Sequence, residues 1–346
     1  MKFGTVPTRE AGGLIAAHTV RAHDVTLRKG LVIPAEDAAR LAAGGLSELV
    51  AVTLEPGDVG EDAAAERLAA HLAGPHLTRE PPFTGRCNLH AATAGLLRID
   101  RAAIDAVNGI DEAITVATLP AHKPVVAGEM VATIKIIPYA VSGEALGRAC
   151  RAAPVGALDV APYCLRRVGV VSTLLPGLKP ATIDKTLANL RRRLAPTGAE
   201  LVSDARVPHR AESLAGAIGA AIREDRAELV VVFGASAIAD RRDVIPTAIE
   251  AAGGRVEHLG MPVDPGNLLL VGGVGDVPVI GAPGCARSPK ENGFDWVLHR
   301  LLAGLAVTRA DIVALGVGGL LMEIVSRPQP RSGGDPAQDT EGEYDA

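Results

Sequence analysis

Aromatic side chains are scarce in this sequence of 346 residues, where they make up 2% of the total. Few rings are available to stack on bases, and a net charge of −5 with no long basic run gives no surface for a phosphate backbone. Nucleic acid is therefore not an expected partner. Hydrophobic residues still make up 48%, so a sizeable core must be built from Leu, Val, Ile and Ala. Such aliphatic runs are typical of buried parallel strands covered by helices.

Cysteine is also scarce, and its spacing excludes two kinds of site. The four cysteines form no C-x-x-C pair, so neither a zinc site nor a disulfide framework is indicated. We expect Cys87, Cys150, Cys164 and Cys285 to be buried free thiols in a reducing cytoplasm. The beginning "MKFGTVPTREAGG" lacks the apolar core of a signal peptide, and no run of about 18 apolar residues predicts a membrane span.

The first half of the chain predicts two small regions. Residues 1–75 predict a helix opened by Pro34 and ended by Gly44-Gly45, then a strand at "LSELVAVTL" and a second helix ending at Gly74. Residues 76–165 predict a mixed region with strands at "ITVATLP" and "GEMVATIKIIPYAV". In the same region we expect a helix at "CNLHAATAGLL" and a linker at "APVGALDVAPYC".

From residue 166 to 304 strand and helix patterns alternate. Apolar runs such as "VGVVS" and "AELVVVF" are followed by helical spacing, as in "ATIDKTLANLRRRLA" and "ESLAGAIGAAIRED". This rhythm predicts an α/β fold of three layers, with helices on both faces of a mostly parallel sheet. Residues 305–326 read as a C-terminal extension, and residues 327–346, rich in Pro, Gly and acid, as a disordered tail. Ligands in such sheets bind at the carboxyl ends of the strands.

One such strand end carries an unusual loop, "GASAIADRRDVIPTAIEAAGG", directly after "LVVVF". Gly234 and Ala235 would let a ligand approach the backbone, and Ser236 offers a hydroxyl. The helix expected to begin near Asp243 would present free N–H groups to an anion. Two interpretations stay open: Asp243 caps that helix, or Asp240 and Asp243 hold Mg²⁺ shared with a phosphate.

Arginines in this loop and in a later one supply possible phosphate ligands. Arg241 and Arg242 could clamp a phosphate bidentately or simply face solvent. In "VIGAPGCARSPK", the turn at Pro283-Gly284 is followed by Arg287 and Ser288 at the carboxyl end of another strand. That stretch is either an anion cradle or an ordinary helix-entry loop, and its spacing excludes a P-loop.

In this order and spacing, these stretches resemble the molybdopterin-binding domain of molybdopterin adenylyltransferases, molybdopterin molybdenumtransferases and gephyrin. "RRDVIPTAIEAAGG" is similar to the Arg-Asp-Val-Thr-Pro-Glu-Ala stretch of the adenylyltransferases. "VDPGNLLLVG" resembles the Lys-Pro-Gly-Lys-Pro loop of the molybdenumtransferases, and "IGAPGCARS" resembles their Leu-Pro-Gly-Asn-Pro turn. "VVSTLLPG" takes the place of a Ser-Thr-Gly-Asp loop. The resemblance covers residues 166–304.

Two further stretches extend the resemblance, and several positions depart from it. "GLVIPAEDAARLAAGGLSELVAV" resembles a segment that precedes this domain in molybdenumtransferases. "CARSPKENGFDWVLHRLLAG" is similar to a bacterial subfamily in which the domain is often fused to a cytidylyltransferase-like domain. Ala235 and Ala237 stand where the family has glycine or threonine, and Asp264 and Asn267 replace its lysines. These departures bear on catalysis more than on binding.

The resemblance implies a cytoplasmic role in molybdenum cofactor biosynthesis. The implied activity is that of a molybdopterin molybdenumtransferase-like transferase, which binds molybdopterin and inserts molybdate into the adenylylated form with Mg²⁺. There are two alternatives. One is a non-catalytic carrier or sensor of molybdopterin, and the other is an unrelated α/β protein that binds another phosphorylated ligand. The implied partners are molybdopterin or its adenylylated form, molybdate, a second copy of the chain, and a cytidylyltransferase or molybdoenzyme maturation protein.

The resemblance also assigns site residues. Asp240 and Asp243 would be the catalytic residues and the metal ligands. The residues implied to bind the pterin are Ser172, Thr173, Gly234, Ala235, Ser236, Arg242, Pro265, Gly266, Pro283, Gly284, Arg287 and Ser288.

Overall fold

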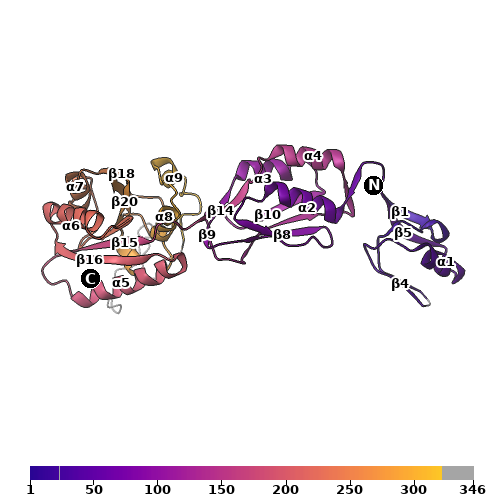
Figure 1. Cartoon of the computed structure of the whole chain (residues 1–346), viewed down its shortest axis with the longest axis horizontal. Coiled ribbons are helices and arrows are strands. Elements are labelled where there is room, and N and C mark those ends of the chain that lie inside the picture. Colours follow the sequence, from indigo (N-terminus) through magenta and orange to yellow (C-terminus); the bar gives the residue numbers. More distant parts are fainter. Residues whose placement is uncertain (23, 322–346) are drawn as a thin grey trace, which may run out of the picture. The chain divides into compact units, whose positions relative to one another are not determined.

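The computed structural model describes residues 1–22 and 24–321, and the chain divides into two compact units (Figure 1). Of the described residues, the first unit holds those in 1–167, 191–200 and 298–306, and the second holds 168–190, 201–297 and 307–321. The expected tail at 327–346, and the end of the extension expected at 305–326, lie outside the described residues. Within those residues no helix is both long and apolar enough to cross a membrane.

The beginning of the first unit contains more strand than its sequence predicts. Its three-stranded antiparallel sheet has the order β1-β5-β2, and β3 pairs with β4. Helix α1 begins directly after Pro34, has two acids in its first turn and buries Leu41. The elements are β1 (Lys2–Pro7), η1 (Thr8–Glu10), β2 (Ile15–Ala16), β3 (Val20–Ala22), β4 (Val25–Leu27), α1 (Ala35–Ala43) and β5 (Glu48–Thr53).

The rest of the first unit contains a four-stranded sheet of order β10-β12-β8-β7, a three-stranded sheet of order β11-β9-β14, and the pair β13-β6. Helix α2 packs on β8 and β12, and its buried face is alanine and leucine. The elements are β6 (Asp58–Gly60), α2 (Glu61–Leu72), β7 (Leu77–Arg79), β8 (Arg86–Ala91), β9 (Gly95–Ile99), α3 (Arg101–Asn108), β10 (Ile114–Thr118), β11 (Pro124–Val125), β12 (Met130–Ile136), β13 (Ala140–Ser142), α4 (Gly143–Ala152) and β14 (Leu158–Pro162).

Two expectations for this region are wrong. The segment "CNLHAATAGLL" is not a helix but contributes to β8 and β9, because pairing with β12 and β14 overrides the helix propensity of its alanines. The segment expected to be a linker, residues 153–164, contains strand β14, which pairs with β9 over five residues.

All four cysteines are free, but only one is fully buried. The Sγ of Cys87 lies 3.4 Å from Oε2 of Glu66, and burial, followed by Glu66, raises the pKa of this thiol to about 12. Cys164 is exposed, so the expectation that every thiol is buried is wrong. Cys87 is an inert core residue under ordinary conditions.

The second unit has the predicted α/β architecture. Its six-stranded sheet has the order β16-β15-β17-β20-β19-β18. Strands β15, β17 and β20 are parallel, whereas β19 is antiparallel to both of its neighbours, β20 and β18. The elements that follow β14 in the chain are β15 (Arg167–Leu174), α5 (Pro180–Leu194), η2 (Ala195–Thr197), β16 (Glu200–Pro208), α6 (Ala211–Arg223), β17 (Leu229–Phe233), α7 (Val244–Ala251), β18 (Arg255–Leu259), β19 (Leu270–Val274), β20 (Val277–Ala282), η3 (Gly284–Arg287), α8 (Gly293–Leu302) and α9 (Arg309–Val313).

Helices cover both faces of this sheet, as the three-layer prediction requires. Figure 1 shows α6 and α7 on one side of β15 and β16, and α5 on the other. Val171 and Val232 pack with residues of α6 and α7 in one core cluster. The alternate residue Phe233 points to the opposite face and contacts Phe294 of α8, with ring centroids 6.4 Å apart.

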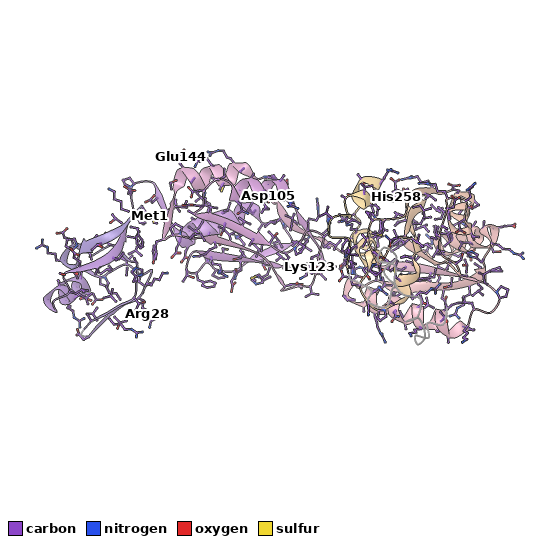
Figure 2. The ribbon with its side chains drawn as sticks, turned by 180° about the vertical axis from the view of Figure 1, so that it is seen from behind. Met1, Arg28, Asp105, Lys123, Glu144 and His258 are labelled. Carbon is purple, nitrogen blue, oxygen red and sulfur yellow. The ribbon has the colours of Figure 1, made fainter. Side chains whose placement is uncertain are left out.

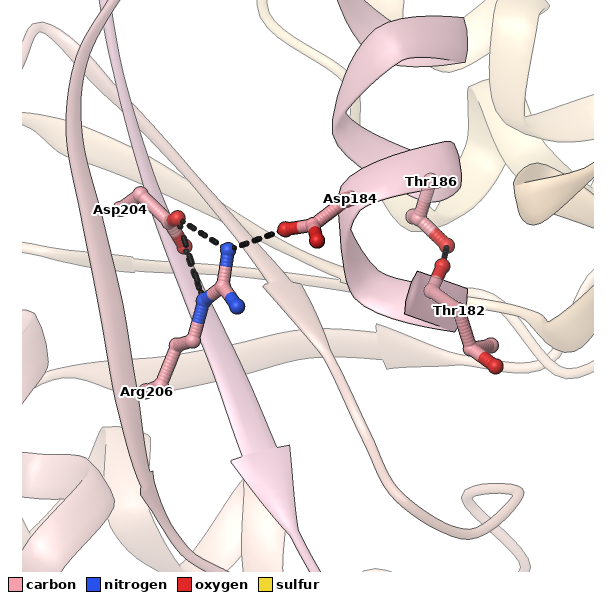
Figure 3. A network of polar contacts seen from close by, with 5 residues as sticks. All are labelled: Thr182, Asp184, Thr186, Asp204 and Arg206. Carbon is pink, nitrogen blue, oxygen red and sulfur yellow. Dashed lines mark hydrogen bonds and ion pairs between the residues drawn. The ribbon is translucent and has the colours of Figure 1, made fainter. Parts of the chain in front are cut away.

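An ion-pair network on the outside of this unit links β16 to α5 (Figure 3). The Nη2 of Arg206 lies 2.7 Å from Oδ1 of Asp184 and 2.9 Å from Oδ2 of Asp204. The two carboxylates raise the pKa of Arg206, which stays charged at any ordinary pH. The strand and the helix are thereby held together at the surface, where water weakens the attraction.

Because this network is open to solvent, we expect Arg206→Ala to lower the free energy of unfolding by only about 1 kcal/mol or less. The loss should shrink further at about 1 M salt, since screening acts over about 3 Å there. Urea denaturation at low and high salt measures both effects. A loss of several kcal/mol that salt does not change would show that the arginine supports packing instead of a surface ion pair.

Candidate functional site

The carboxyl ends of three parallel strands lie in one row at the edge of the second unit's sheet. Ser172 of β15 is in register with Phe233 of β17, and Phe233 is in register with Ala282 of β20. Thr173, Gly234 and Pro283 follow these three positions in the chain. The structure therefore brings together the strand ends that the sequence predicts to form a site.

Arg287 lies across these strand ends. Its Nη2 donates to the carbonyl oxygen of Gly234 at 2.8 Å, and its Nη1 donates to Oγ1 of Thr186 at 3.1 Å. The guanidinium carbon lies 5.4 Å from the centroid of the Phe233 ring. The backbone oxygen of Arg287 accepts a hydrogen bond of 2.6 Å from Nδ2 of Asn189. Strand β17, helix α5 and the turn after β20 together fix this cation.

The charge of Arg287 has no counter-ion among the described residues. No ion pair joins it to a carboxylate, and both of its hydrogen-bond acceptors are neutral. Burial lowers its pKa, which means that the surroundings disfavour the charge and no acid nearby offsets this. A half-buried guanidinium of this kind is suited to an anionic ligand.

A second unsatisfied group lies in the same row. Ser172 is 1% exposed, and its hydroxyl has no hydrogen-bond partner among the described residues. Its register with Phe233 places it on the face of the sheet that carries Arg287. A buried hydroxyl without a partner costs free energy, so a ligand oxygen that pairs with it would recover this cost.

On the face of the sheet opposite to Arg287, three side chains form a series of hydrogen bonds that begins at Thr173 of β15. Oγ1 of Thr173 accepts from the backbone N–H of Ala235 at 2.8 Å and lies 2.8 Å from Nδ1 of His209. The other ring nitrogen of His209, Nε2, lies 3.0 Å from Oγ of Ser236. Thr173 is fully buried, whereas Ser236 is exposed.

Sequence reasoning did not find His209. It follows β16, and its backbone N–H donates to the oxygen of Leu174, at the end of β15. Only the pairing of these two strands brings it beside Thr173. The one signal in the sequence is its place directly after Pro208, which the structure shows to be the last residue of β16.

The loop after β17 places its acids as capping residues. Oδ1 of Asp243 accepts from the N–H of Val244 at 2.7 Å, and Oδ2 accepts from the N–H of Ala239 at 3.2 Å. Asp240 forms an ion pair with Arg242 at 2.7 Å, and that hydrogen bond lowers the pKa of Asp240. These contacts favour the helix-cap interpretation of Asp243.

The assignment of Asp240 and Asp243 as metal ligands stays a prediction. In the described parts of the chain no group of three or more His, Cys, Asp and Glu side chains is placed to hold a metal ion. One carboxylate is engaged by backbone N–H groups and the other by a guanidinium, so the donor set does not fit a magnesium site.

The two arginines of this loop do not join Arg287. Arg242 is 91% exposed and occupied by Asp240. Arg241 donates to the backbone oxygen of Val256 in β18 at 3.4 Å. Burial, and then the charges of Arg309 and Arg241, lower the pKa of His258, the residue labelled on β18 in Figure 2. Arg241 therefore faces the antiparallel edge of the sheet.

The remaining predicted residues have local roles. Gly266 has φ +142°, and a Cβ there would lie 3.0 Å from the backbone of Gly293. The carbonyl oxygen of Pro265 accepts the N–H of Gly293 at 2.8 Å, so this turn packs on the start of α8. Gly284 opens onto free space, and Oγ of Ser288 accepts the N–H of Lys290. A Cβ on Gly234 would lie 2.7 Å from the oxygen of Ser236, so the tight loop after β17 requires glycine.

The first unit has a polar cavity of its own, of about 440 Å³. Arg98, Asp100, His122 and Asp159 line it. Two of these groups are engaged by the protein: Asp100 caps α3, and Asp159 pairs with His76 at 3.2 Å. Basic and acidic side chains are mixed there, so the cavity lacks the unopposed charge found at Arg287.

Comparisons with known proteins give structural likenesses only. A scan against models of protein families finds no match, and a search of curated proteins finds none. Among solved structures, a molybdopterin biosynthesis MoeA protein from Pyrococcus horikoshii is 16% identical, with a TM-score of 0.31, over 88% of this chain and 75% of that one.

Two further solved structures are similar at the same level. The molybdopterin biosynthesis enzyme MoaB from Thermus thermophilus is 18% identical, with a TM-score of 0.28, over 40% of this chain and 98% of that one. A molybdenum cofactor biosynthesis protein from Pyrococcus furiosus is 12% identical, with a TM-score of 0.26, over 90% of this chain and 65% of that one. These scores are too low to carry an argument, so any ligand must be argued from contacts within the site.

Proposed function

We propose that this chain binds molybdopterin, or its adenylylated form, through a phosphate group at the carboxyl ends of β15, β17 and β20. The observation that carries the proposal is Arg287, a half-buried cation held over these strand ends with no counter-ion among the described residues. The loop motifs that resemble the molybdopterin-binding domain support the choice of a pterin over other phosphorylated ligands.

The contacts favour Arg287 over the start of α7 as the anchor for the phosphate. The carboxylate of Asp243 already accepts the first N–H of that helix, and a second anion there would be repelled. At Arg287 a phosphate would offset a charge that burial disfavours. The unpaired hydroxyl of Ser172, on the same face of the sheet, would donate to a phosphate oxygen.

The same contacts favour binding over catalysis. Insertion of molybdate with Mg²⁺ would need carboxylates free to hold the ion, and the oxygens of Asp240 and Asp243 are engaged by protein donors. We therefore propose a carrier of the pterin as the function of this site, with the molybdenumtransferase as the second candidate. A molybdenumtransferase would turn over adenylylated molybdopterin. The substitution Asp243→Asn would then abolish this turnover while pterin binding remains.

The test is whether a pterin co-purifies with the protein. The full chain is produced in a host that makes molybdopterin, and bound pterin is identified by mass spectrometry and quantified by fluorescence after oxidation. We expect a pterin close to one per chain, and none from a host that lacks molybdopterin synthesis. Protein that carries no pterin from the first host, and takes up none when incubated with molybdopterin, would overturn the proposal.

A further inference from the structure

We propose that Thr173, His209 and Ser236 form a hydrogen-bond relay with one fixed direction, which makes the Ser236 hydroxyl a donor to a phosphoryl oxygen of the ligand. The direction follows from contacts within the protein. Only the identity of the phosphorylated ligand rests on the proposed function.

Thr173 sets the direction of the relay. Its hydroxyl oxygen accepts the N–H of Ala235, and the only other partner of that hydroxyl in the described chain is Nδ1 of His209. Because Thr173 is fully buried, its own proton cannot go to water. The hydroxyl must donate to Nδ1, since a buried O–H without an acceptor disfavours the reverse arrangement by on the order of tenfold or more.

The direction then passes through the imidazole to Ser236. A neutral histidine whose Nδ1 accepts carries its proton on Nε2. That N–H donates to Oγ of Ser236, 3.0 Å away. The proton of the Ser236 hydroxyl has no acceptor within the described residues, and the side chain is exposed. Thr173 and His209 therefore act as positioning residues, and Ser236 presents a donor to the outside.

The groups around this hydroxyl specify the chemistry of the ligand. The backbone N–H groups of Ser236 and Ala237 have no acceptor within the described part of the chain, so two further donors lie beside the hydroxyl at the tip of the loop. A phosphoryl group, which has several acceptor oxygens and a negative charge, satisfies such donors. Arg287 lies toward the other face of the sheet but is bonded to Gly234 at the base of the same loop, so the Ser236 tip would bind a phosphoryl oxygen of the ligand that Arg287 anchors.

The same three residues could be mistaken for a nucleophilic triad with Ser236 as nucleophile and His209 as base. That arrangement needs the proton on Nδ1, where it would donate to Thr173 and leave the buried threonine proton without an acceptor. The two directions give opposite protonation of the ring, and this difference can be measured.

The first experiment is nitrogen-15 NMR of the histidine side chains in the full chain at neutral pH. We expect His209 to show a protonated Nε2 and an unprotonated Nδ1. Thr173→Val should mix the two tautomers, and Thr173→Ser should restore the wild-type pattern if the hydroxyl alone is responsible. A proton on Nδ1 in the wild type would overturn the relay.

The second experiment measures binding of inorganic phosphate by titration. Loss of one charge-assisted hydrogen bond should weaken binding about tenfold or more in Ser236→Ala. His209→Ala should weaken it by a similar factor, while His209→Gln, whose amide N–H can replace Nε2–H, should keep most of it. Ser213→Ala, in helix α6, serves as the control. Equal binding by wild type and Ser236→Ala would overturn the proposed phosphate contact.

A serine-reactive fluorophosphonate separates the relay from the nucleophile. We expect no labelling of Ser236, and labelling that His209→Gln abolishes would overturn the relay. Failure of the proposed function looks different: the ring would be protonated on Nε2 and phosphate would bind, but no pterin would co-purify.

Discussion

Arg287→Met should lower the affinity for molybdopterin by at least about 100-fold while the protein stays folded. Charge-assisted bonds from a guanidinium to a phosphate are about twice as strong as neutral ones, and this cation has no carboxylate partner among the described residues that already occupies it. Methionine keeps the apolar part of the side chain over Phe233 and removes a charge that burial disfavours. Bound pterin per chain after purification, and phosphate titration, measure the loss.

Matched variants separate the charge from its geometry. Arg287→Lys keeps a cation but not the two-pronged guanidinium, so we expect an intermediate loss of roughly tenfold. Arg255→Ala removes an arginine on β18 whose side chain is 83% exposed, and it should change neither binding nor stability. If Arg287→Met binds as tightly as the wild type, the phosphate is not anchored at these strand ends, and the assignment of the site fails.

Much of the fold of the second unit could be predicted from periodicity. The run "LVVVF" becomes the central strand β17, and Ile183, Leu187, Leu190 and Leu194 of α5 are all buried, as their helical spacing indicates. Strand direction could not be predicted in the same way. Strand β19 reads like its neighbours but runs antiparallel to both of them, because the short connection after it turns the chain straight back into β20.

The errors in the first unit both concern strands that pair with segments distant in sequence. Residues 86–99 are rich in alanine and leucine, which favour helix locally, but their partners are strands β12 and β14, distant in sequence. Partners of this kind override propensity, and a single sequence does not reveal them. The proline and glycine neighbours of β14 are typical of loops, so the sequence indicates a linker where this strand forms.

At the candidate site, too, some residues could be predicted from the sequence, whereas others depend on contacts that only the fold creates. Gly234 and Arg287 could be named because parallel strands end at one edge and small or polar residues follow, whereas Ser172 was implied by the resemblance to the molybdopterin-binding domain. The choice between a cap and a metal ligand at Asp243 needed the position of its oxygens relative to two backbone N–H groups. Identifying His209 required knowing that β15 and β16 are neighbours in the sheet. Residue type and order predict the edge of the sheet, but side-chain partners across strands follow only from the fold.

Phe233→Ala should produce the largest loss of stability, about 3–5 kcal/mol in the second unit. The ring is 1% exposed, contacts Phe294 and lies beneath Arg287, so its removal leaves a cavity between the sheet and α8. The single tryptophan, Trp296, lies on α8 within this unit, and its fluorescence during urea denaturation reports the transition. Phe83→Ala removes a ring that is 51% exposed in the first unit and should cost about 0.5 kcal/mol or less.

The same substitution tests whether packing and binding are coupled at this site. The guanidinium of Arg287 rests on the Phe233 ring, and such a contact contributes about 0.5–2 kcal/mol. In a double-mutant cycle, the loss of binding free energy in the double variant Phe233→Ala/Arg287→Met should therefore be smaller than the sum of the losses in the two single variants. Strict additivity would mean that the ring supports the sheet without holding the cation. A coupling of the expected size would mean that the core residue at the end of β17 also fixes the group that binds the phosphate.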